Sequence, residues 1–519
     1  MVQIEETIYK ELIQHKQRVP LLELEICLLK EKLRLAGKRQ FTPSSEKLSS
    51  EQQALLFNEL EATAEPETPE VETITYTRRA RGQRTLDLGS LPTEEIHYDL
   101  PDEEQVCPQC EGSLHKMGEQ VREELKFIPA KLIWVKHICA KYACRHCQTQ
   151  AIKTPILLAP MPQPAFPGSL ASPSLVANIL CQKYVLSVPL YRQEQDLQRR
   201  GLAISRQNLS NWAIRGADLL APLYNHLRAL LLERKILHAD ETELQVLHEE
   251  GRLAQRKSYI WLYRSGRDGP QIVLYEYQPT REAIHPKKFL LGFSGYLHVD
   301  GYDAYDTLPD VKLAGCWAHA RRKFTDALAA LPASDRKQGG TEAHKGLMFC
   351  QNLFKIESDL RDVSAEERHA ARLERSKPVL DKMHLWLQSV KLELLPKSAT
   401  GGAVGYCLNQ WSKLICFLAD GRLEIDNNRS ERAIKPFVIG RKNWLFSNTP
   451  KGASSSSIVY SIIETAKENN LDLFCYLTYL FERLPNINVK DPVALENLLP
   501  WAEAIQSKFS VPQKPTRSK

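Results

Sequence analysis

The chain has 519 residues, of which 43% are hydrophobic and 25% are charged, and its net charge is +6. This length exceeds that of one ordinary domain, and the composition excludes a disordered or fibrous protein, whereas the mild positive charge alone identifies no partner. The sequence holds no run of about 18 apolar residues and no apolar signal core near its start, so we expect a cytoplasmic protein without a membrane span.

Residues 1–60 predict a helical, zipper-like region. Apolar residues recur at heptad-like intervals from Ile8 to Leu33, which is typical of a coiled coil. Pro20 interrupts the pattern, and His15 occupies one of its apolar positions. Two interpretations stay open at this point: the helix joins copies of the chain into a homo-oligomer, or it packs on its own chain.

Residues 61–100 predict a flexible linker. The acidic, proline-containing stretch EATAEPETPEVE is followed by the basic run RRARGQR. Low hydrophobicity and separate charge blocks are typical of disordered segments. The basic run could enter a DNA groove, as basic arms do, or it could be a solvated tether.

Residues 101–152 predict a zinc-binding domain. Two CxxC motifs suit tetrahedral thiolate coordination of a structural Zn²⁺, and the expected ligands are Cys107, Cys110, Cys144 and Cys147. Twelve cysteines are too few for a disulfide scaffold in a chain of this length. The others lie in apolar contexts, and we expect them in the core: Cys27, Cys139, Cys181, Cys316, Cys350, Cys407, Cys416 and Cys475.

Residues 165–230 predict a helical region that contains a helix-turn-helix. Gly201 stands where a first helix would end with a positive φ, and Ser205 is suited to cap the second helix. The second helix of such a motif often reads DNA. Its candidate DNA-binding residues are Arg206, Gln207, Asn208 and Asn211. The alternative is a pair of helices that serves only packing.

Residues 231–450 alternate strand and helix patterns, which predicts an α/β domain. The expected strands lie within residues 235–249, 259–265, 271–278, 295–302 and 311–319. The turn signal GRDG joins the second and third strands as a hairpin, and ARRKFTDALAAL forms a helix after the fifth strand. Residues from about 335 to 415 have a charged helical pattern and predict an insertion. Residues 451–490 predict a further helical segment, and residues 491–519 predict a tail.

Two aspartates end apolar strands of this domain. Asp240 follows LHA, and Asp300 follows YLHV. On adjacent strands both carboxylates would lie within a few ångströms, where they would repel each other without a cation. Oxygen ligands suit Mg²⁺ or Mn²⁺, and two such ions promote phosphodiester cleavage. A third carboxylate is expected in DNNRSERAIKPF, where Glu431 and Asp426 compete and Asp426 could instead cap the helix.

The motifs HADET, HVDGYDAY and IDNNRSERAIKPFVIGRKNWLFS occur in this order. Together with the preceding motifs, they resemble the transposases of the bacterial insertion sequence 66 family, a group of DDE transposases. The resemblance extends from about residue 20 to about residue 485. It favours Glu431 over Asp426, because the family pattern NNxxER matches Asn427, Asn428, Glu431 and Arg432.

This resemblance implies an RNase H-like catalytic core with a helical insertion. It also implies a two-metal site of Mg²⁺ or Mn²⁺ held by Asp240, Asp300 and Glu431. The implied partners are the terminal inverted repeats of a mobile element, target DNA at the nucleoid, and small accessory proteins of the same element. The implied reaction is hydrolysis of a phosphodiester at the element end, followed by attack of the freed 3′-hydroxyl on target DNA.

Two basic segments near these motifs are further candidates for DNA contact. Their residues are His319, Arg321 and Arg322 after the fifth strand, and Arg441, Lys442 and Trp444 after the third motif. The alternatives are a solvated helix start and core packing of the tryptophan. Two other functions remain open: a catalytically silent zinc-ribbon DNA-binding protein derived from a transposase, and an RNase H-like nuclease without joining activity.

Overall fold

The computed structural model describes residues 6–41, 131–143 and 156–511. The chain forms two compact units, one of Met1–Glu46 with Met161–Lys519 and the other of Lys47–Pro160. The predicted linker at 61–100 and the four predicted zinc ligands lie outside the described residues. No helix among the described residues is long and apolar enough to cross a membrane.

The smaller unit contains a two-stranded antiparallel sheet. β1 (Lys141–Ala143) pairs with β2 (Ile156–Leu158), with Lys141 opposite Leu158. Cys139 is partly exposed and donates a hydrogen bond from Sγ to the carbonyl oxygen of Ala159, 3.2 Å away. The expectation of a core position for Cys139 therefore holds only in part.

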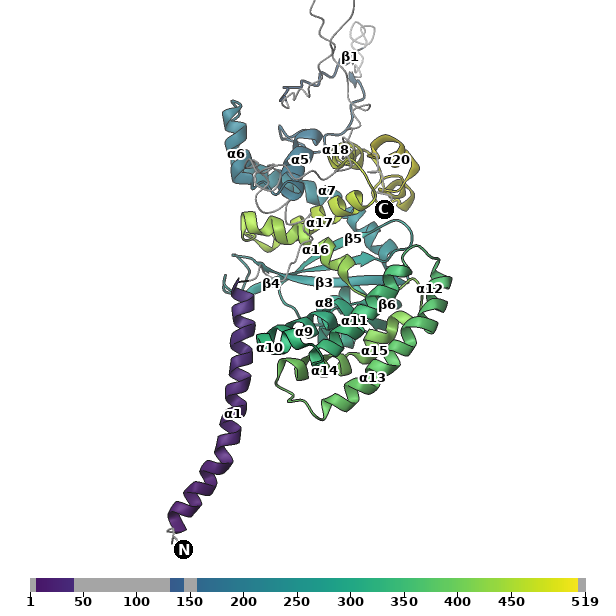
Figure 1. Ribbon diagram of the computed structural model, residues 1–519. Coiled ribbons are helices and arrows are strands. Elements are labelled where there is room, and N and C mark those ends of the chain that lie inside the picture. The colour runs from purple at the N-terminus through teal and green to yellow at the C-terminus, as the bar shows by residue number, and fades with distance from the viewer. Residues whose placement is uncertain (1–5, 42–130, 144–155, 512–519) are drawn as a thin grey trace, which may run out of the picture. The chain divides into compact units, whose positions relative to one another are not determined.

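The larger unit is built on a five-stranded mixed sheet with the order β5-β4-β3-β6-β7 (Figure 1). Its strands are β3 (Ile236–Gln245), β4 (Lys257–Ser265), β5 (Val273–Gln278), β6 (Gly295–His298) and β7 (Val311–Ala314). β3 is antiparallel to β4 and parallel to β6, and β6 is parallel to β7. The five strands expected from the sequence are thus all present, including the hairpin of β4 and β5.

The central position of β3 follows from its sequence. Its first four residues, Ile236–Ala239, are all buried, as expected for a strand that is covered on both faces. β6 approaches β3 closely at Gly295, where a Cβ atom would overlap the carbonyl oxygen of Lys235. That carbonyl accepts a hydrogen bond from the backbone N–H of Tyr296 at 2.8 Å, which fixes the register of the two strands.

Helices cover one edge of the sheet. α17 (Pro450–Glu468) lies along β5 in Figure 1. The backbone N–H groups of Val273 and Tyr275 donate to the hydroxyl oxygens of Thr465 (3.0 Å) and Ser461 (2.8 Å). An edge strand would otherwise expose unpaired N–H groups, so these helix side chains block further strand addition at β5.

The region before the sheet is helical, as expected. α5 (Pro173–Leu180) leads through a π-helical turn to α6 (Leu190–Arg199) and α7 (Arg206–Leu232). Gly201 has φ of 84° in the turn between α6 and α7, and the Ser205 hydroxyl accepts from the backbone N–H of Asn208. Both predictions about this turn are confirmed.

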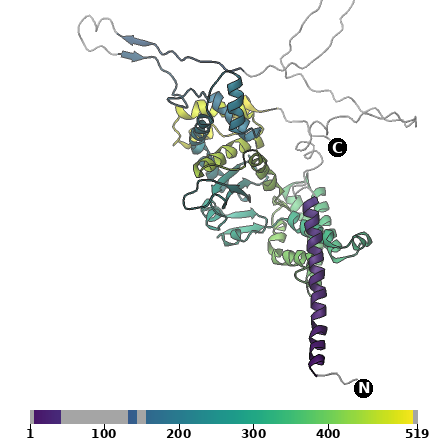
Figure 2. The same cartoon turned by 90° about the vertical axis from the view of Figure 1, so that its left-hand side faces the viewer.

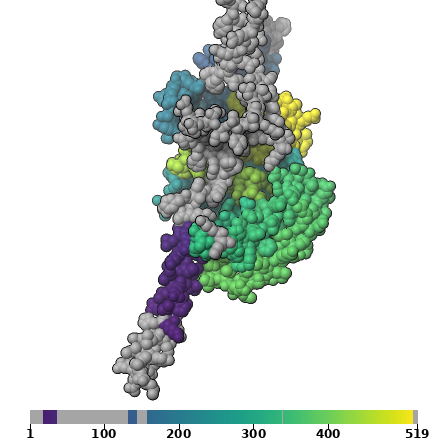
Figure 3. Space-filling view, viewed as in Figure 1, coloured from purple at the N-terminus to yellow at the C-terminus, as the bar shows by residue number. Residues whose placement is uncertain are grey.

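Between β7 and the helix that carries Glu431, the chain forms the expected helical group. α9 (Trp317–Ala330) precedes it, and α8 (Ile284–Phe289) lies between β5 and β6. The insertion helices are α10 (Ala333–Gln338), α11 (Glu342–Asp359), α12 (Ala365–Ala371), α13 (Lys377–Lys391), α14 (Ala399–Asn409) and α15 (Trp411–Leu414). The green surface in Figure 3 belongs to this part of the chain. With α9 the insertion helices enclose a core of their own, which includes Phe324, Cys350 and Leu387.

The structure does not bear out the tail expected at residues 491–519, because much of this segment is folded. After α16 (Asn428–Trp444), α17 and α18 (Leu473–Arg483), two short helices follow, α19 (Pro492–Glu496) and α20 (Glu503–Phe509). Leu495, Leu499 and Ile505 are buried in the main core. Residues up to Phe509 are therefore part of the folded unit, because their few apolar side chains are spaced to reach it.

The N-terminal helix α1 runs unbroken from Glu6 to Phe41, although Pro20 lies inside it. Its C-terminal part lies beside α9 (Figure 2), and the Arg34 guanidinium donates to the carbonyl oxygen of Ala330. Apolar side chains of the expected heptad pattern are exposed: Val19, Leu22, Ile26, Leu29 and Leu33. Self-association through this face stays a prediction.

Exposure of the cysteines corrects another expectation. Cys316, Cys350 and Cys407 are buried as expected, whereas Cys181 and Cys416 are partly exposed. Cys27 and Cys475 are exposed, so the prediction that they belong to the core was wrong. Apolar neighbours in the sequence did not imply burial here, because Ile26 and Phe474, which lie next to these two cysteines, are exposed as well.

Candidate active site

β3 and β6 bring two of the expected carboxylates together. Asp300 follows the end of β6 by two residues, as expected, whereas Asp240 lies in the middle of β3 and not at its end, because β3 continues to Gln245 in its pairing with β4. The parallel register pairs His238 with His298, and Asp240 and Asp300 each lie two residues further along. The backbone N–H of Glu241 donates to Asp240 Oδ1 at 2.8 Å, and that of Tyr302 donates to Asp300 Oδ1 at 3.1 Å. Both side chains are therefore oriented by the backbone that follows them.

The Asp240 carboxyl lies in a strongly acidic environment. Burial raises its pKa well above 3.8, and the charges of Glu241, Asp300 and Glu431 raise it further. Three carboxylates from separate elements thus act on Asp240. Like charges held together in this way favour either a shared proton or a bound cation.

Glu431 lies in the first turn of α16. Two buried hydrogen bonds of the Asn427 side chain, the Asn427 clasp, hold the start of this helix against β3. The Asn427 side chain donates from Nδ2 to the carbonyl oxygen of Ala239 and accepts at Oδ1 from His238 Nδ1, both at 2.9 Å. Asn427 occupies the N-cap position but makes no side-chain capping bond. The side-chain amide instead bonds to two residues of β3, and this contact fixes the start of the helix that carries Glu431 relative to the strand that carries Asp240.

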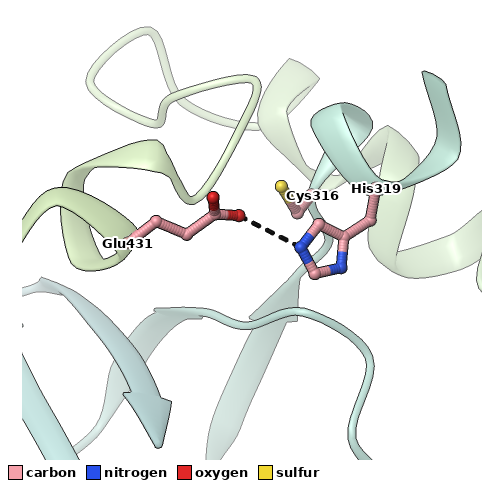
Figure 4. A group of neighbouring side chains, drawn as sticks. All are labelled: Cys316, His319 and Glu431. Carbon is pink, nitrogen blue, oxygen red and sulfur yellow. Dashed lines mark hydrogen bonds and ion pairs between the residues drawn. The ribbon is translucent and has the colours of Figure 1, made fainter. Parts of the chain in front are cut away.

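Basic side chains surround Glu431 on the other side. His319 Nε2 lies 3.0 Å from Glu431 Oε1, and Figure 4 shows this contact. The Arg322 guanidinium lies 3.8 Å from Glu431 Oε2. The hydrogen bond from His319, followed by the charges of Arg322 and Lys435, outweighs burial and lowers the pKa of Glu431. Glu431 is therefore an ionised carboxylate whose charge is partly balanced by α9.

Asp426, the competing third carboxylate, has local partners. It accepts from the backbone N–H of Asn428 at 3.1 Å and from the Asn428 side chain at 2.7 Å. Burial raises its pKa, and the charges of Glu424 and Glu431 add to this effect. The contact with Asn428 matches the alternative role of supporting the helix start.

Glu241 is a buried member of the carboxylate cluster that the sequence analysis did not single out. It is paired with Arg281, whose Nε lies 2.9 Å from Oε1, and it accepts from the Tyr305 hydroxyl at 2.7 Å. Burial and the charge of Asp300 nevertheless raise its pKa. The adjacent acidic pair in HADET was the available signal for a second carboxylate on this strand.

Two buried histidines lie on β3 and β6, each two residues before one of the aspartates. His238 and His298 stack with ring centroids 4.5 Å apart and an interplanar angle of 9°. Burial lowers the pKa of His238 to about 4 and that of His298 well below 6.5, so both rings are neutral. The backbone N–H of Glu424 donates to His298 Nε2 at 3.3 Å. These neutral histidines add no positive charge to balance the nearby carboxylates.

The candidate DNA-binding residues fall into separate groups. The four on α7 are all exposed in its first two turns: Arg206, Gln207, Asn208 and Asn211. His319 and Arg322 join the carboxylate cluster, whereas the Arg321 guanidinium lies over the Phe354 ring at 4.8 Å.

The basic segment at the end of α16 is more strongly tied to the protein itself. Trp444 is partly buried against Tyr184 and Tyr460. Arg441 is partly buried and donates to the Thr242 hydroxyl at 3.4 Å, while Lys442 is exposed. The aromatic contacts of Trp444 agree with the packing alternative, and its stacking on a base stays a prediction.

Family comparisons cover most of the chain. A family model described as "Transposase IS66 family" matches residues 168–455, which include Asp240, Asp300 and Glu431. Residues 104–148 match the "zinc-finger binding domain of transposase IS66", and residues 461–501 match the "IS66 C-terminal element". Residues 28–96 match the model described as "Transposase C of IS166 homeodomain".

Similar full-length proteins occur in Sinorhizobium fredii (strain NBRC 101917 / NGR234). The chain is 33% identical over 439 residues to the uncharacterized protein y4jD, an alignment that covers 82% of this chain and 83% of the relative. It is 30% identical over 510 residues to the uncharacterized protein y4hP, with 92% and 88% covered. It is also 30% identical over 492 residues to the uncharacterized protein y4qI, with 90% and 87% covered.

Proposed function

The chain belongs to the transposase IS66 family, and from this premise we propose that Asp240, Asp300 and Glu431 are the catalytic carboxylates of this DNA transposase. The observation that carries the proposal is electrostatic: Asp300 and Glu431, from two other elements, both act on the carboxyl group of Asp240. Structural ion pairs also perturb pKa values, but here the perturbing groups carry the same charge as the perturbed one.

The proposed fold of the catalytic core is RNase H-like. The sheet order β5-β4-β3-β6-β7, with an antiparallel hairpin followed by two parallel strands, supports it. In this arrangement the first and fourth strands are neighbours, with Asp240 in the middle of β3 and Asp300 two residues after the end of β6. The helix α16 then supplies Glu431 from the far side of the helical insertion.

The donor set fits divalent cations such as Mg²⁺ or Mn²⁺. All three proposed ligands are carboxylates. The buried histidines that precede the two aspartates on β3 and β6, His238 and His298, are neutral. When bound, two such ions supply activation of the attacking oxygen and neutralisation of charge at the leaving oxygen. Asp240 and Asp300 would hold the ions, and Glu431 would complete the set. The Asn427 clasp joins the start of the helix that carries Glu431 to the strand that carries Asp240.

The proposed reaction has two steps of phosphoryl transfer without a covalent enzyme intermediate. Water hydrolyses a phosphodiester at the element end, which leaves a 3′-hydroxyl and a 5′-phosphate. The 3′-hydroxyl then attacks a phosphodiester of target DNA, forming one bond and releasing one 3′-hydroxyl. Arg322 lies beside Glu431 and can contact a phosphate in this position.

Other parts of the chain are proposed to hold DNA and to assemble the protein. The zinc-finger segment would bind Zn²⁺ through its two CxxC motifs, and the exposed start of α7 would contact DNA. The exposed apolar stripe of α1 would pair with a second copy of the chain. Accessory proteins of the same element would assist in trans.

The test is transposition of the intact locus, accessory genes included, from a donor plasmid. Glu431→Gln should lower both cleaved and joined products by at least about 100-fold, because it removes a charged ligand and keeps the shape. Asp426→Asn is the matched control and should retain activity. If Glu431→Gln moves as well as wild type while Asp426→Asn fails, Asp426 replaces Glu431 in the proposal.

The same assay separates the two alternative functions. A nuclease without joining activity would give cleaved ends and no joined products. A silent DNA-binding derivative would retard the donor DNA and give neither product, even with accessory proteins present.

A further inference from the structure

A second group of metal-ligating side chains lies beside the proposed catalytic carboxylates. We propose that Cys316, His319 and Glu431 bind Zn²⁺ through the cysteine sulfur, the imidazole and the carboxylate. Their ligand atoms all lie within 4.8 Å of one another. In Figure 4 the thiol and the imidazole come from the start of one helix and face the carboxylate of another.

The local fold brings these ligands together without strain. Cys316 is the N-cap residue of α9, and His319 lies in its first turn, so a spacing of three places both side chains on the same side of the helix. Glu431 comes from the first turn of α16. The backbone N–H of Asn427, beside that turn, donates to Cys316 Sγ at 3.2 Å and ties the two helix starts together.

The protons on this group can be displaced by a cation. Burial raises the pKa of Cys316 to about 12, although the backbone N–H groups of Asn427 and His319 partly stabilise the thiolate. Zn²⁺ binding would release the thiol proton to solvent, and the imidazole would bind through a ring nitrogen that carries no proton. One Zn²⁺, one thiolate and one carboxylate then sum to zero charge, which suits a site with one buried and two partly buried ligands.

The ligand chemistry separates this site from the carboxylate set. Sulfur and imidazole nitrogen favour Zn²⁺, whereas Mg²⁺ prefers oxygen ligands. Three protein ligands also leave a fourth position open, unlike a closed structural zinc site. Because Glu431 belongs to both groups, Zn²⁺ here would withdraw it from Asp240 and Asp300. Zn²⁺ would therefore inhibit Mg²⁺-dependent strand cleavage, a consequence that rests on the proposed function, whereas the binding itself does not.

The binding test uses the full-length protein with Zn²⁺ and with Co²⁺, whose thiolate complexes absorb in the near ultraviolet. Cys316→Ser keeps an acceptor for the Asn427 N–H and should lose one metal equivalent relative to wild type. Cys350→Ser, at another fully buried cysteine on α11, is the matched control and should retain wild-type stoichiometry. The zinc-finger cysteines are the same in all variants, so their contribution cancels in the difference.

His319→Ala provides a second variant at a partly exposed position and should also lose the equivalent. The expected difference spectrum, wild type minus Cys316→Ser, contains a thiolate-to-Co²⁺ band. Equal stoichiometry in wild type, Cys316→Ser and His319→Ala, with no such band, would overturn the proposal.

The inhibition test measures strand cleavage in Mg²⁺ against increasing Zn²⁺, each rate relative to that variant's own zinc-free rate. The Zn²⁺ concentration for half inhibition should rise at least about 10-fold in Cys316→Ser, since loss of even an outer-shell partner weakens metal sites by about 10–100-fold and Cys316 is a proposed direct ligand. A metal equivalent that depends on Cys316 without any Mg²⁺-dependent cleavage would overturn the proposed function and leave the zinc site standing. Mg²⁺-dependent cleavage without a metal equivalent that depends on Cys316 would overturn the zinc site and leave the proposed function standing.

Discussion

The Asn427 clasp gives the most direct test of how the fold positions the active site. The side-chain amide joins the start of α16 to β3 through two buried hydrogen bonds, to the Ala239 carbonyl oxygen and from His238 Nδ1. Asn427→Ala removes both bonds and leaves both partners buried and unsatisfied. Because the Asn427 side chain makes no capping bond, loss of a helix cap adds nothing to the effect.

The expected cost follows from these contacts. An unsatisfied buried partner costs about 1–3 kcal/mol, so the two together should lower the free energy of unfolding by about 2–6 kcal/mol. With a urea dependence of about 3 kcal/mol per M, the midpoint of unfolding should fall by about 0.7–2 M. Intrinsic fluorescence can follow this transition, since Trp261 and Trp317 are fully buried in the larger unit.

The clasp should also affect strand cleavage under conditions where the variant stays folded. A displacement of about 1 Å at a reacting group can cost about 100-fold in rate, so cleavage by Asn427→Ala should fall while DNA binding is retained. Asn443→Ala is the matched control, because Asn443 is exposed on the same helix and its side chain donates to the Ile439 carbonyl oxygen of that helix. If Asn427→Ala unfolds at the same urea concentration as Asn443→Ala, the clasp does not hold α16 to β3.

Three further predictions concern the Asp240 carboxyl group, Mg²⁺ binding and the packing of Gly440. In buffer free of divalent cations, the raised pKa of Asp240 means that its contribution to stability is fully present below pH 3.8 and is lost as pH rises through the folded-state pKa. Thermal unfolding should therefore show Asp240→Asn becoming more stable than wild type as pH rises, and a constant difference would contradict this reasoning. Mg²⁺ at about 100 times its Kd should stabilise wild type by about 2.7 kcal/mol and leave Asp240→Asn unchanged, and equal shifts would argue against a role for Asp240 as ligand. Gly440→Ala should destabilise the protein by about 1–3 kcal/mol in urea titrations, because its Cβ would overlap Trp444 and the Tyr460 hydroxyl, and an unchanged midpoint would refute that packing.

Much of the fold was predictable because its signals are local. The strands from β3 to β7 follow from apolar stretches and one hairpin turn, and the turn before α7 follows from Gly201 and Ser205. The helical insertion was predictable from its charged helical pattern. The C-terminal helices α19 and α20 were not, because a few apolar residues in a polar stretch reveal nothing about whether a core lies within reach.

Asp240 and Asp300 could also be named from the sequence, since each directly follows an apolar stretch, although β3 continues past Asp240 to Gln245. Glu241 could have been included on the same signal. The sequence could not rank Glu431 against Asp426 without a resemblance, because both lie at one helix start. Their different surroundings, His319 and Arg322 for one and Asn428 for the other, depend on which helices pack there.

The sequence by itself thus determined the elements, their order and the residue types that can hold a cation. Only the tertiary structure decided which of these side chains meet. His238 and Asn427 are 189 residues apart yet share a buried hydrogen bond, and Cys316, His319 and Glu431 converge across the whole insertion. Periodicity and capping act over a few residues of chain, whereas such contacts are fixed by strand register and helix packing, which no local pattern encodes.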